Sequence, residues 1–128
     1  MSGRRDEPTS GTPRAAALLR AAGIDARIDL DVPKLSQPVE QVLAWALREG
    51  VTNVLRHSQA HTCLITAGSR DRRLWLEILN DGVHASAGAG GGLTGLAERA
   101  RAVSGSVTAH GTGDGWFRLR VEDPEEVA

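Results

Sequence analysis

The sequence predicts an α+β fold, a two-layer sandwich with its helices on one face of a mixed or antiparallel sheet. Helical and strand-like segments follow one another in the order helix, strand, helix, strand, strand, helix, strand, strand. Two pairs of these strands are separated by short turns, which predicts hairpins and argues against a doubly wound parallel sheet. The length of 128 residues fits one domain with one core.

Composition and charge exclude several classes of protein. Fifteen basic residues against sixteen acidic ones give a net charge of −1, so no overall field favours nucleic acid or an anionic membrane. The single cysteine, Cys63, excludes an intrachain disulfide and a cysteine metal cluster, which predicts a cytoplasmic setting. No run reaches the ~18 apolar residues of a membrane span, and the start has no signal-peptide pattern, so no membrane contact is expected.

The first two elements are a short helix and a strand. Thr12 followed by Pro13 is typical of a helix start, and Gly23 suits the left-handed residue after a helix, so a helix is predicted over 13–22. Residues 25–31 alternate between polar and apolar side chains, which predicts a half-buried strand. Its core-facing residues would be Ala26, Ile28 and Leu30.

A long helix is predicted from Ser36, which can cap it with Pro38 in the first turn, to His57. Its packing face would comprise Leu43, Leu47, Val51, Val54 and Leu55. Its opposite face presents Glu49, Asn53, Arg56 and His57. This face is either a solvated surface or a site. Asn53 favours a site, because asparagine is a poor helix-interior residue and its amide oxygen is a ligand of the kind that Mg²⁺ takes.

A hairpin is expected next, with strands over 62–67 and 74–80 joined by the charged turn 69–72. Leu74, Leu76 and Ile78 should face the core. The following Asn80-Asp81-Gly82 is either an ordinary turn or a binding element. In the second case, the Asp81 carboxylate could accept a hydrogen bond from the exocyclic amine of adenine, where guanine has a carbonyl.

A glycine-rich segment, 85–92, precedes a helix predicted over 93–103 and is expected to be mobile. Glycines allow close approach of a ligand, and the first amides of a helix attract anions. The segment is therefore either a phosphate-binding loop or a flexible linker. The helix should stop at Gly105, and a second hairpin is predicted over 106–110 and 116–122. Residues 1–11 should be a disordered lead-in, 12–124 the domain and 125–128 a tail.

The three candidate sites occur in an order that resembles a known family. Glu49-x-x-x-Asn53-x-x-Arg56-His57, then Asn80-Asp81-Gly82, then Gly90-x-Gly92-Leu93-x-Gly95-Leu96 resemble the N box and the two glycine boxes of sensor histidine kinases. The phrases REGVTNVLRH, LEILNDG and GGGLTGLAERARAVSG are most similar to the desaturase-thermosensor and nitrate-sensor branch. The resemblance covers nearly the whole chain and implies the Bergerat, or GHKL, ATP-binding fold.

The resemblance implies a role for each matching residue. Asn53 would hold Mg²⁺, Glu49 would support the metal or its water, and Arg56 and His57 would lie near the phosphates of ATP. Asp81 would accept from the adenine amine and Gly82 would leave room for the ring. The phosphate-facing lid would contain Gly90, Gly92, Leu93, Thr94 and Gly95. Two departures stand out: Gly82 is followed by Val83-His84 instead of a second glycine, and Phe117 stands where the family often has threonine.

The implied activity is transfer of the γ-phosphoryl group of ATP to a histidine on a separate dimerisation domain, which passes it to a response regulator. The four histidines of this chain are each followed by a non-acidic residue, unlike the acceptor of this branch: His57, His61, His84 and His110. The acceptor is therefore expected outside the chain. The resemblance also implies a monomeric domain in the cytoplasm or in the cytoplasmic part of a membrane-anchored sensor. The alternatives are a stand-alone GHKL ATP-binding module, an anti-sigma-type serine kinase and a degenerate nucleotide domain.

Overall fold

The computed structural model describes residues 12–57, 59–82 and 91–124. The elements in chain order are α1 (Thr12–Ala21), β1 (Asp25–Leu30), α2 (Gln37–His57), β2 (Thr62–Arg70), β3 (Arg73–Asn80), α3 (Gly91–Ala102), β4 (Ser106–Gly111) and β5 (Phe117–Pro124). The expected lead-in, the tail and most of the glycine-rich segment lie outside the described residues. Among the described helices, none has the length and apolar character that a membrane span requires.

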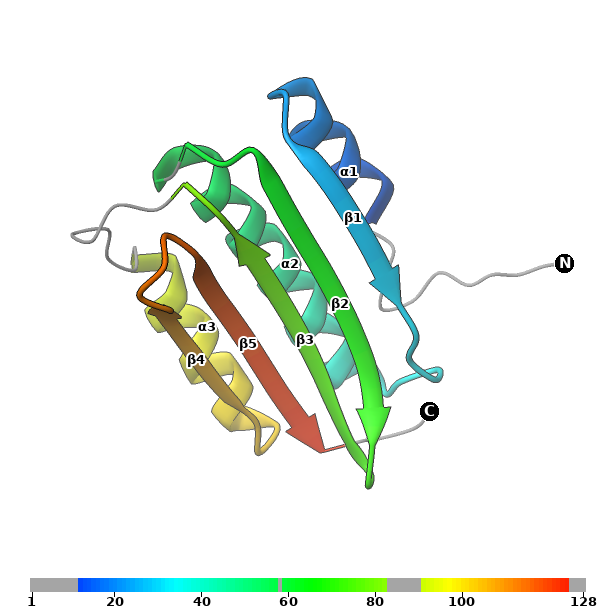
Figure 1. Cartoon of the computed structure of the whole chain (residues 1–128). Coiled ribbons are helices and arrows are strands. Elements are labelled where there is room, and N and C mark those ends of the chain that lie inside the picture. Colours follow the sequence, from blue (N-terminus) through cyan, green and yellow to red (C-terminus); the bar gives the residue numbers. More distant parts are fainter. Residues whose placement is uncertain (1–11, 58, 83–90, 125–128) are drawn as a thin grey trace, which may run out of the picture.

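One five-stranded sheet organises the molecule, in the order β1-β2-β3-β5-β4. β1 pairs with β2 in parallel, and the other three pairings are antiparallel. All three helices lie on the same face of this sheet, with α2 between α1 and α3 (Figure 1). The two-layer α+β sandwich predicted from the element order is therefore confirmed, and the sheet is mixed.

The core lies between the helices and the sheet and is aliphatic. In β3, every second residue is buried, and Leu74, Leu76 and Ile78 face the helices as predicted. In β1, Ala26 is buried, and Ile28 and Leu30 pack against the core as partly buried residues, while the polar residues between them are exposed. Gly50 brings α2 close to the sheet, because a Cβ there would overlap Ile78 and lie 3.1 Å from Leu119.

Three local predictions are corrected by the structure. The first hairpin turns at Asp71 and Arg72 alone, both with positive φ, so its strands are longer than the expected turn 69–72 allowed. The third helix begins at Gly91, before the predicted start at Leu93. Leu55 is 38% exposed instead of packing on the sheet, because its position on α2 turns it toward the outer surface.

The face of the sheet away from the helices carries a network of paired charges. Glu77 accepts a hydrogen bond of 2.8 Å from Arg120, which also donates to Glu122 at 2.7 Å. The Arg120 guanidinium carbon lies 5.0 Å from the centre of the Trp75 ring, and that ring covers Gly68. Arg120 therefore has one charged partner on the neighbouring strand β3 and a second one on its own strand β5.

Candidate functional site

Three segments with chemistry-bearing residues meet at one edge of the molecule. The C-terminal end of α2, the C-terminal end of β3 and the N-terminal end of α3 lie near one another there (Figure 1). They are far apart in the sequence, and the sheet brings them together because β3 is central and α2 packs across it. The three segments in which the sequence predicted a nucleotide site are therefore neighbours in space.

The α2 part of the site is the flank of the helix that carries the predicted N box. Glu49 and Asn53 are both half-buried, and their spacing of four residues places them one turn apart on the same side. Arg56 is exposed one turn further on. His57 is the last residue of α2, and its side chain lies outside the described part of the structure. A carboxylate and an amide oxygen thus lie one turn apart on the same side of α2, partly open to solvent.

Asp81 directly follows β3 and is held by the backbone at the start of β2. Its Oδ1 accepts hydrogen bonds from the amide nitrogens of His61, at 2.7 Å, and Thr62, at 2.9 Å. Its own amide donates to the carbonyl of Thr62 at 3.3 Å. Because Oδ1 already accepts two bonds, an adenine amine would have to bind Oδ2. The carboxylate is positioned before any ligand arrives.

Asn80 supports this arrangement and was not among the site residues predicted from the sequence. It is 3% exposed, and its Nδ2 donates to the carbonyl oxygen of Asp81 at 2.9 Å. This bond restrains the peptide that carries Asp81, so Asn80 is a positioning residue. The signal in the sequence was the polar residue at the end of an otherwise apolar strand, where a buried amide needs a partner.

Gly82 is required by the chain around it. Its φ is +72°, a region that favours glycine, and a Cβ there would overlap the carbonyl oxygen of Gln59 and lie 2.8 Å from the amide of Ala60. Its carbonyl accepts a hydrogen bond of 3.0 Å from the Gln59 amide. The glycine therefore fixes the connection between α2 and β2 against the end of β3. Its predicted role beside the adenine ring stays a prediction.

The start of α3 offers backbone amides to the same edge. Its first turn contains no acidic residue, and the amides of a first helical turn favour anions. Gly92, Leu93 and Thr94 lie in this helix. The side chains of Leu93 and Thr94, and the whole of Gly90, lie outside the described part of the structure. A Cβ on Gly95 would meet no described atom within 4 Å, so packing within the described chain does not require a glycine there. Close approach of a ligand is one reason for a glycine at this position.

Cys63 lies on β2 beside this edge and is fully buried. Burial, and then the negative charge of Asp81, raise the pKa of its thiol to about 12. The thiolate is the reactive form of cysteine, so Cys63 is an inert part of the core at neutral pH.

The donor set fits a magnesium ion that is shared with phosphates. Among the described residues there is no group of three or more histidine, cysteine or carboxylate side chains able to enclose a metal. Mg²⁺ is usually held by one or two protein oxygens together with phosphate and water. The side chains of Glu49 and Asn53 supply that number, beside a helix start suited to phosphate.

Sequence comparison finds relatives among the sensor histidine kinases, although no family model matches the chain. The chain is 33% identical over 102 residues to the signal transduction histidine-protein kinase/phosphatase UhpB of Salmonella typhimurium, a match covering 73% of this chain and 20% of UhpB. It is 37% identical over 84 residues to the sensor histidine kinase DesK of Bacillus subtilis, covering 57% of this chain and 22% of DesK. The chain thus spans about a fifth of these relatives.

Comparison with solved structures gives the same class. The catalytic domain of the histidine kinase ThkA matches with a TM-score of 0.67 and 14% identity, and the match covers 100% of both chains. At this identity the likeness shows the fold alone. Together, fold and sequence define a GHKL-type ATP-binding domain. The chain belongs to the sensor histidine kinase family, and it is similar to UhpB and DesK over about a fifth of their length.

Proposed function

We propose that this domain binds Mg²⁺-ATP at the edge formed by α2, β3 and α3, and donates the γ-phosphoryl group to a histidine on a separate dimerisation domain. The observation that carries the proposal is the meeting, at this edge, of the end of α2, the end of β3 with the anchored carboxylate of Asp81, and the start of α3 (Figure 1). The matches to histidine kinases support the choice of acceptor. The response regulator that receives the phosphoryl group, and a cytoplasmic location, are part of the same proposal.

Different residues would bind the adenine and the phosphates of the nucleotide. Asp81 would select adenine through Oδ2, with Asn80 and the β2 amides holding it in place. Asn53 and Glu49 would hold the metal, whose charge, when it is bound, offsets that of the phosphates. Arg56 and the α3 amides would bind phosphate oxygens. This chemistry is mainly positioning and charge neutralisation, so no general base is needed within the chain.

Phosphorylation with γ-labelled ATP tests the proposal. The isolated chain should bind Mg²⁺-ATP but take up no label, because none of its four histidines is followed by an acidic residue. Acid-labile label should appear on histidine when a dimerisation domain of a DesK-type kinase is added. The control is the same dimerisation domain with its acceptor histidine replaced by alanine, which should stay unlabelled.

The other outcomes identify the alternatives. Acid-labile label retained by this chain alone would contradict the proposal that the acceptor histidine lies on a separate domain. Acid-stable label on a serine of an added partner would favour an anti-sigma-type kinase. Binding of ATP without transfer to any dimerisation domain would favour a stand-alone module, and no ATP binding at all would favour a degenerate domain.

A further inference from the structure

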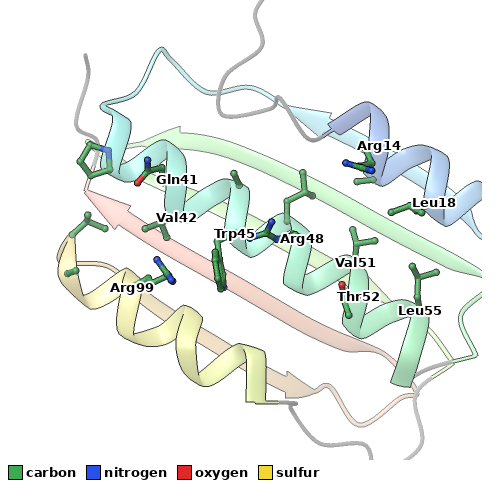
Figure 2. A pocket seen from close by; sticks show the side chains of 16 residues that line it. Arg14, Leu18, Gln41, Val42, Trp45, Arg48, Val51, Thr52, Leu55 and Arg99 are labelled. Atoms are coloured by element: carbon green, nitrogen blue, oxygen red, sulfur yellow. The ribbon is translucent and has the colours of Figure 1, made fainter.

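A groove runs along the outer surface of α2 and reaches the C-terminal part of that helix. It has a volume of about 630 Å³ and lies between α1 on one side and α3 on the other (Figure 2). It extends along α2 from Pro38 to Leu55, a length of about 26 Å at 1.5 Å per helical residue. Glu49, Asn53 and Arg56 do not line it. The groove is therefore a separate surface from the proposed ATP site.

The groove exposes apolar side chains that the rest of the described surface does not. Among the described residues, the large hydrophobic side chains that are exposed are Leu18, at 48%, and Leu55, at 38%. Both line this groove, one from α1 and one from α2, and they lie toward the same end of it (Figure 2). Leu55 is the residue that periodicity assigned to the core. An apolar side chain that is turned out of the core and gathered with another is typical of an interaction surface.

The charged side chains that line the groove are all positive. Arg14, Arg48 and Arg99 line it, and its lining contains no aspartate or glutamate. Within the described part of the chain, none of the three makes a salt bridge, in contrast to Arg120 on the opposite face of the molecule. The guanidinium carbons of Arg48 and Arg99 instead lie 4.8 and 4.0 Å from the centre of the Trp45 ring. The groove is thus an apolar strip with cations along it.

Trp45 lies at the middle of the groove, next to two of these arginines (Figure 2). Its ring is held by Arg48 and Arg99, and its Nε1 is buried without a hydrogen-bond partner among the described residues. A buried indole N–H usually has a hydrogen-bond acceptor, and the absence of that hydrogen bond lowers the stability of the fold. A carboxylate from outside could pair with the two guanidinium groups that flank the ring.

We propose that this groove is a docking site for an amphipathic helix whose apolar stripe is bordered by carboxylates. The length of the groove and its opening to the surface fit about five helical turns lying in it. The apolar stripe would cover Leu18 and Leu55, and the carboxylates would meet Arg14, Arg48 and Arg99. A second copy of this chain is a poor occupant, because a two-fold pairing of the same groove would set arginines against arginines.

Titration of the ¹⁵N-labelled full chain with a pair of peptides tests the proposal. Both peptides are helical, about 18 residues long, and carry leucine at the spacing of one helix face. One has glutamate beside the leucines and the other has lysine. The acidic peptide should shift the Trp45 indole resonance, identified by its loss in Trp45→Phe, and its binding should weaken with salt. The basic peptide should bind at least about tenfold more weakly.

Surface variants make the test specific. Leu55→Asp should abolish binding of the acidic peptide, and Arg48→Glu should weaken it about tenfold while strengthening binding of the basic peptide. Arg101→Glu is the matched control, because Arg101 is exposed on α3 and does not line the groove. It should leave both affinities unchanged. All three variants should keep the affinity for Mg²⁺-ATP, so this test is independent of the proposed kinase function.

Four results would overturn the proposal. Equal binding of both peptides would show that charge does not select the partner. No shift of the Trp45 indole with either peptide would show that the groove accepts no helix. Binding of dodecanoate at Trp45 in place of the acidic peptide would assign the groove to a small anionic amphiphile. Dimerisation of the chain that Leu55→Asp abolishes would assign it to a second copy.

Discussion

Asp81 shows how one carboxylate can have a structural and a binding role at once. Oδ1 is held by two amides of the chain at the start of β2, which leaves Oδ2 as the oxygen for an adenine amine. Asparagine at this position could keep the amide bonds through its oxygen but would place an NH₂ group where Oδ2 was. The fold would then survive a change that reverses the hydrogen-bonding character of the proposed pocket.

We therefore expect Asp81→Asn to lose its preference for ATP over GTP. Losing a hydrogen bond to a charged acceptor costs about 1.5–3 kcal/mol, so binding of ATP should weaken by about 10- to 100-fold. Calorimetric titration with ATP and GTP, beside a melting curve to show that the fold is intact, measures this. Equal affinity of the wild type for the two nucleotides would contradict the assignment of Asp81 to adenine.

Asn53 should act through the metal alone. Asn53→Ala removes one oxygen ligand and leaves the end of β3 untouched, so binding of Mg²⁺-ATP should weaken by about 10- to 100-fold while metal-free ATP binds as before. Alanine is the better helix former, by up to about 0.7 kcal/mol, so the helix itself should not suffer. Titrations with Mg²⁺ and with EDTA separate the two affinities.

The control for this experiment is Thr52→Ala, at the neighbouring half-buried position of α2 that lines the groove instead. It should change neither affinity. An equal loss of affinity with and without metal in Asn53→Ala would instead mean that the position contributes to nucleotide binding in general.

At the scale of elements, α1 and α3 end with the same backbone motif but with different residues at its left-handed position. After α1, Ile24 donates to the carbonyl of Leu19, and Gly23 has a φ of +82°. After α3, Gly105 donates to the carbonyl of Ala100, and the left-handed residue is Ser104, with a φ of +63°. These are Schellman caps, in which glycine is the residue normally favoured.

This comparison predicts that Ser104→Gly stabilises the domain. Removing the strain of a left-handed non-glycine residue should raise the free energy of unfolding by about 1–2 kcal/mol. The greater conformational freedom of glycine in the unfolded chain lowers it by about 0.4–1 kcal/mol. A net gain of about 0.5 kcal/mol should raise the melting temperature by about 2–4 °C. The reverse change at the matched position, Gly23→Ser, should lower it. Unchanged or lower stability in Ser104→Gly would show that the Ser104 side chain stabilises the cap.

The sequence predicted where α3 ends but not the reason. Gly105 was expected as the terminating residue, yet the positive φ falls on Ser104. Gly105 is a glycine because a Cβ there would overlap Asp123 and lie 2.7 Å from the carbonyl oxygen of Glu122. That contact joins residues distant in the chain, so local pattern could not reveal it. The two-residue turn at Asp71 and Arg72 was not predicted for a different reason: arginine is not typical of positive φ.

At the scale of the molecule, periodicity predicted the layers of the fold because burial on a sheet repeats every second residue. It did not predict the strand order, in which β5 lies between β3 and β4, because pairing partners depend on contacts far apart in sequence. The same limit applied to the site. Its segments were found by motif, whereas the bonds that hold Asp81, from His61, Thr62 and Asn80, came only from the assembled sheet.

The position of β1 at the edge of the sheet has a consequence for the order of folding. β1 pairs only with β2, in parallel, and the chain must pass through all of α2 between them. β2 and β3 are joined by a turn of two residues. Closing a short loop costs less chain entropy than closing a long one, so the hairpins should form early and α1 with β1 should join late.

Two core truncations separate early from late steps in a stopped-flow experiment that follows tryptophan fluorescence. Leu19 of α1 is 0% exposed and Leu76 of β3 is 4% exposed, so either change to alanine should cost about 2–5 kcal/mol. Leu76→Ala should mainly slow refolding, because its strand belongs to the early hairpin. Leu19→Ala should leave refolding nearly unchanged and accelerate unfolding, which would make the α1–β1 unit the part of this domain that sets its lifetime in the folded state.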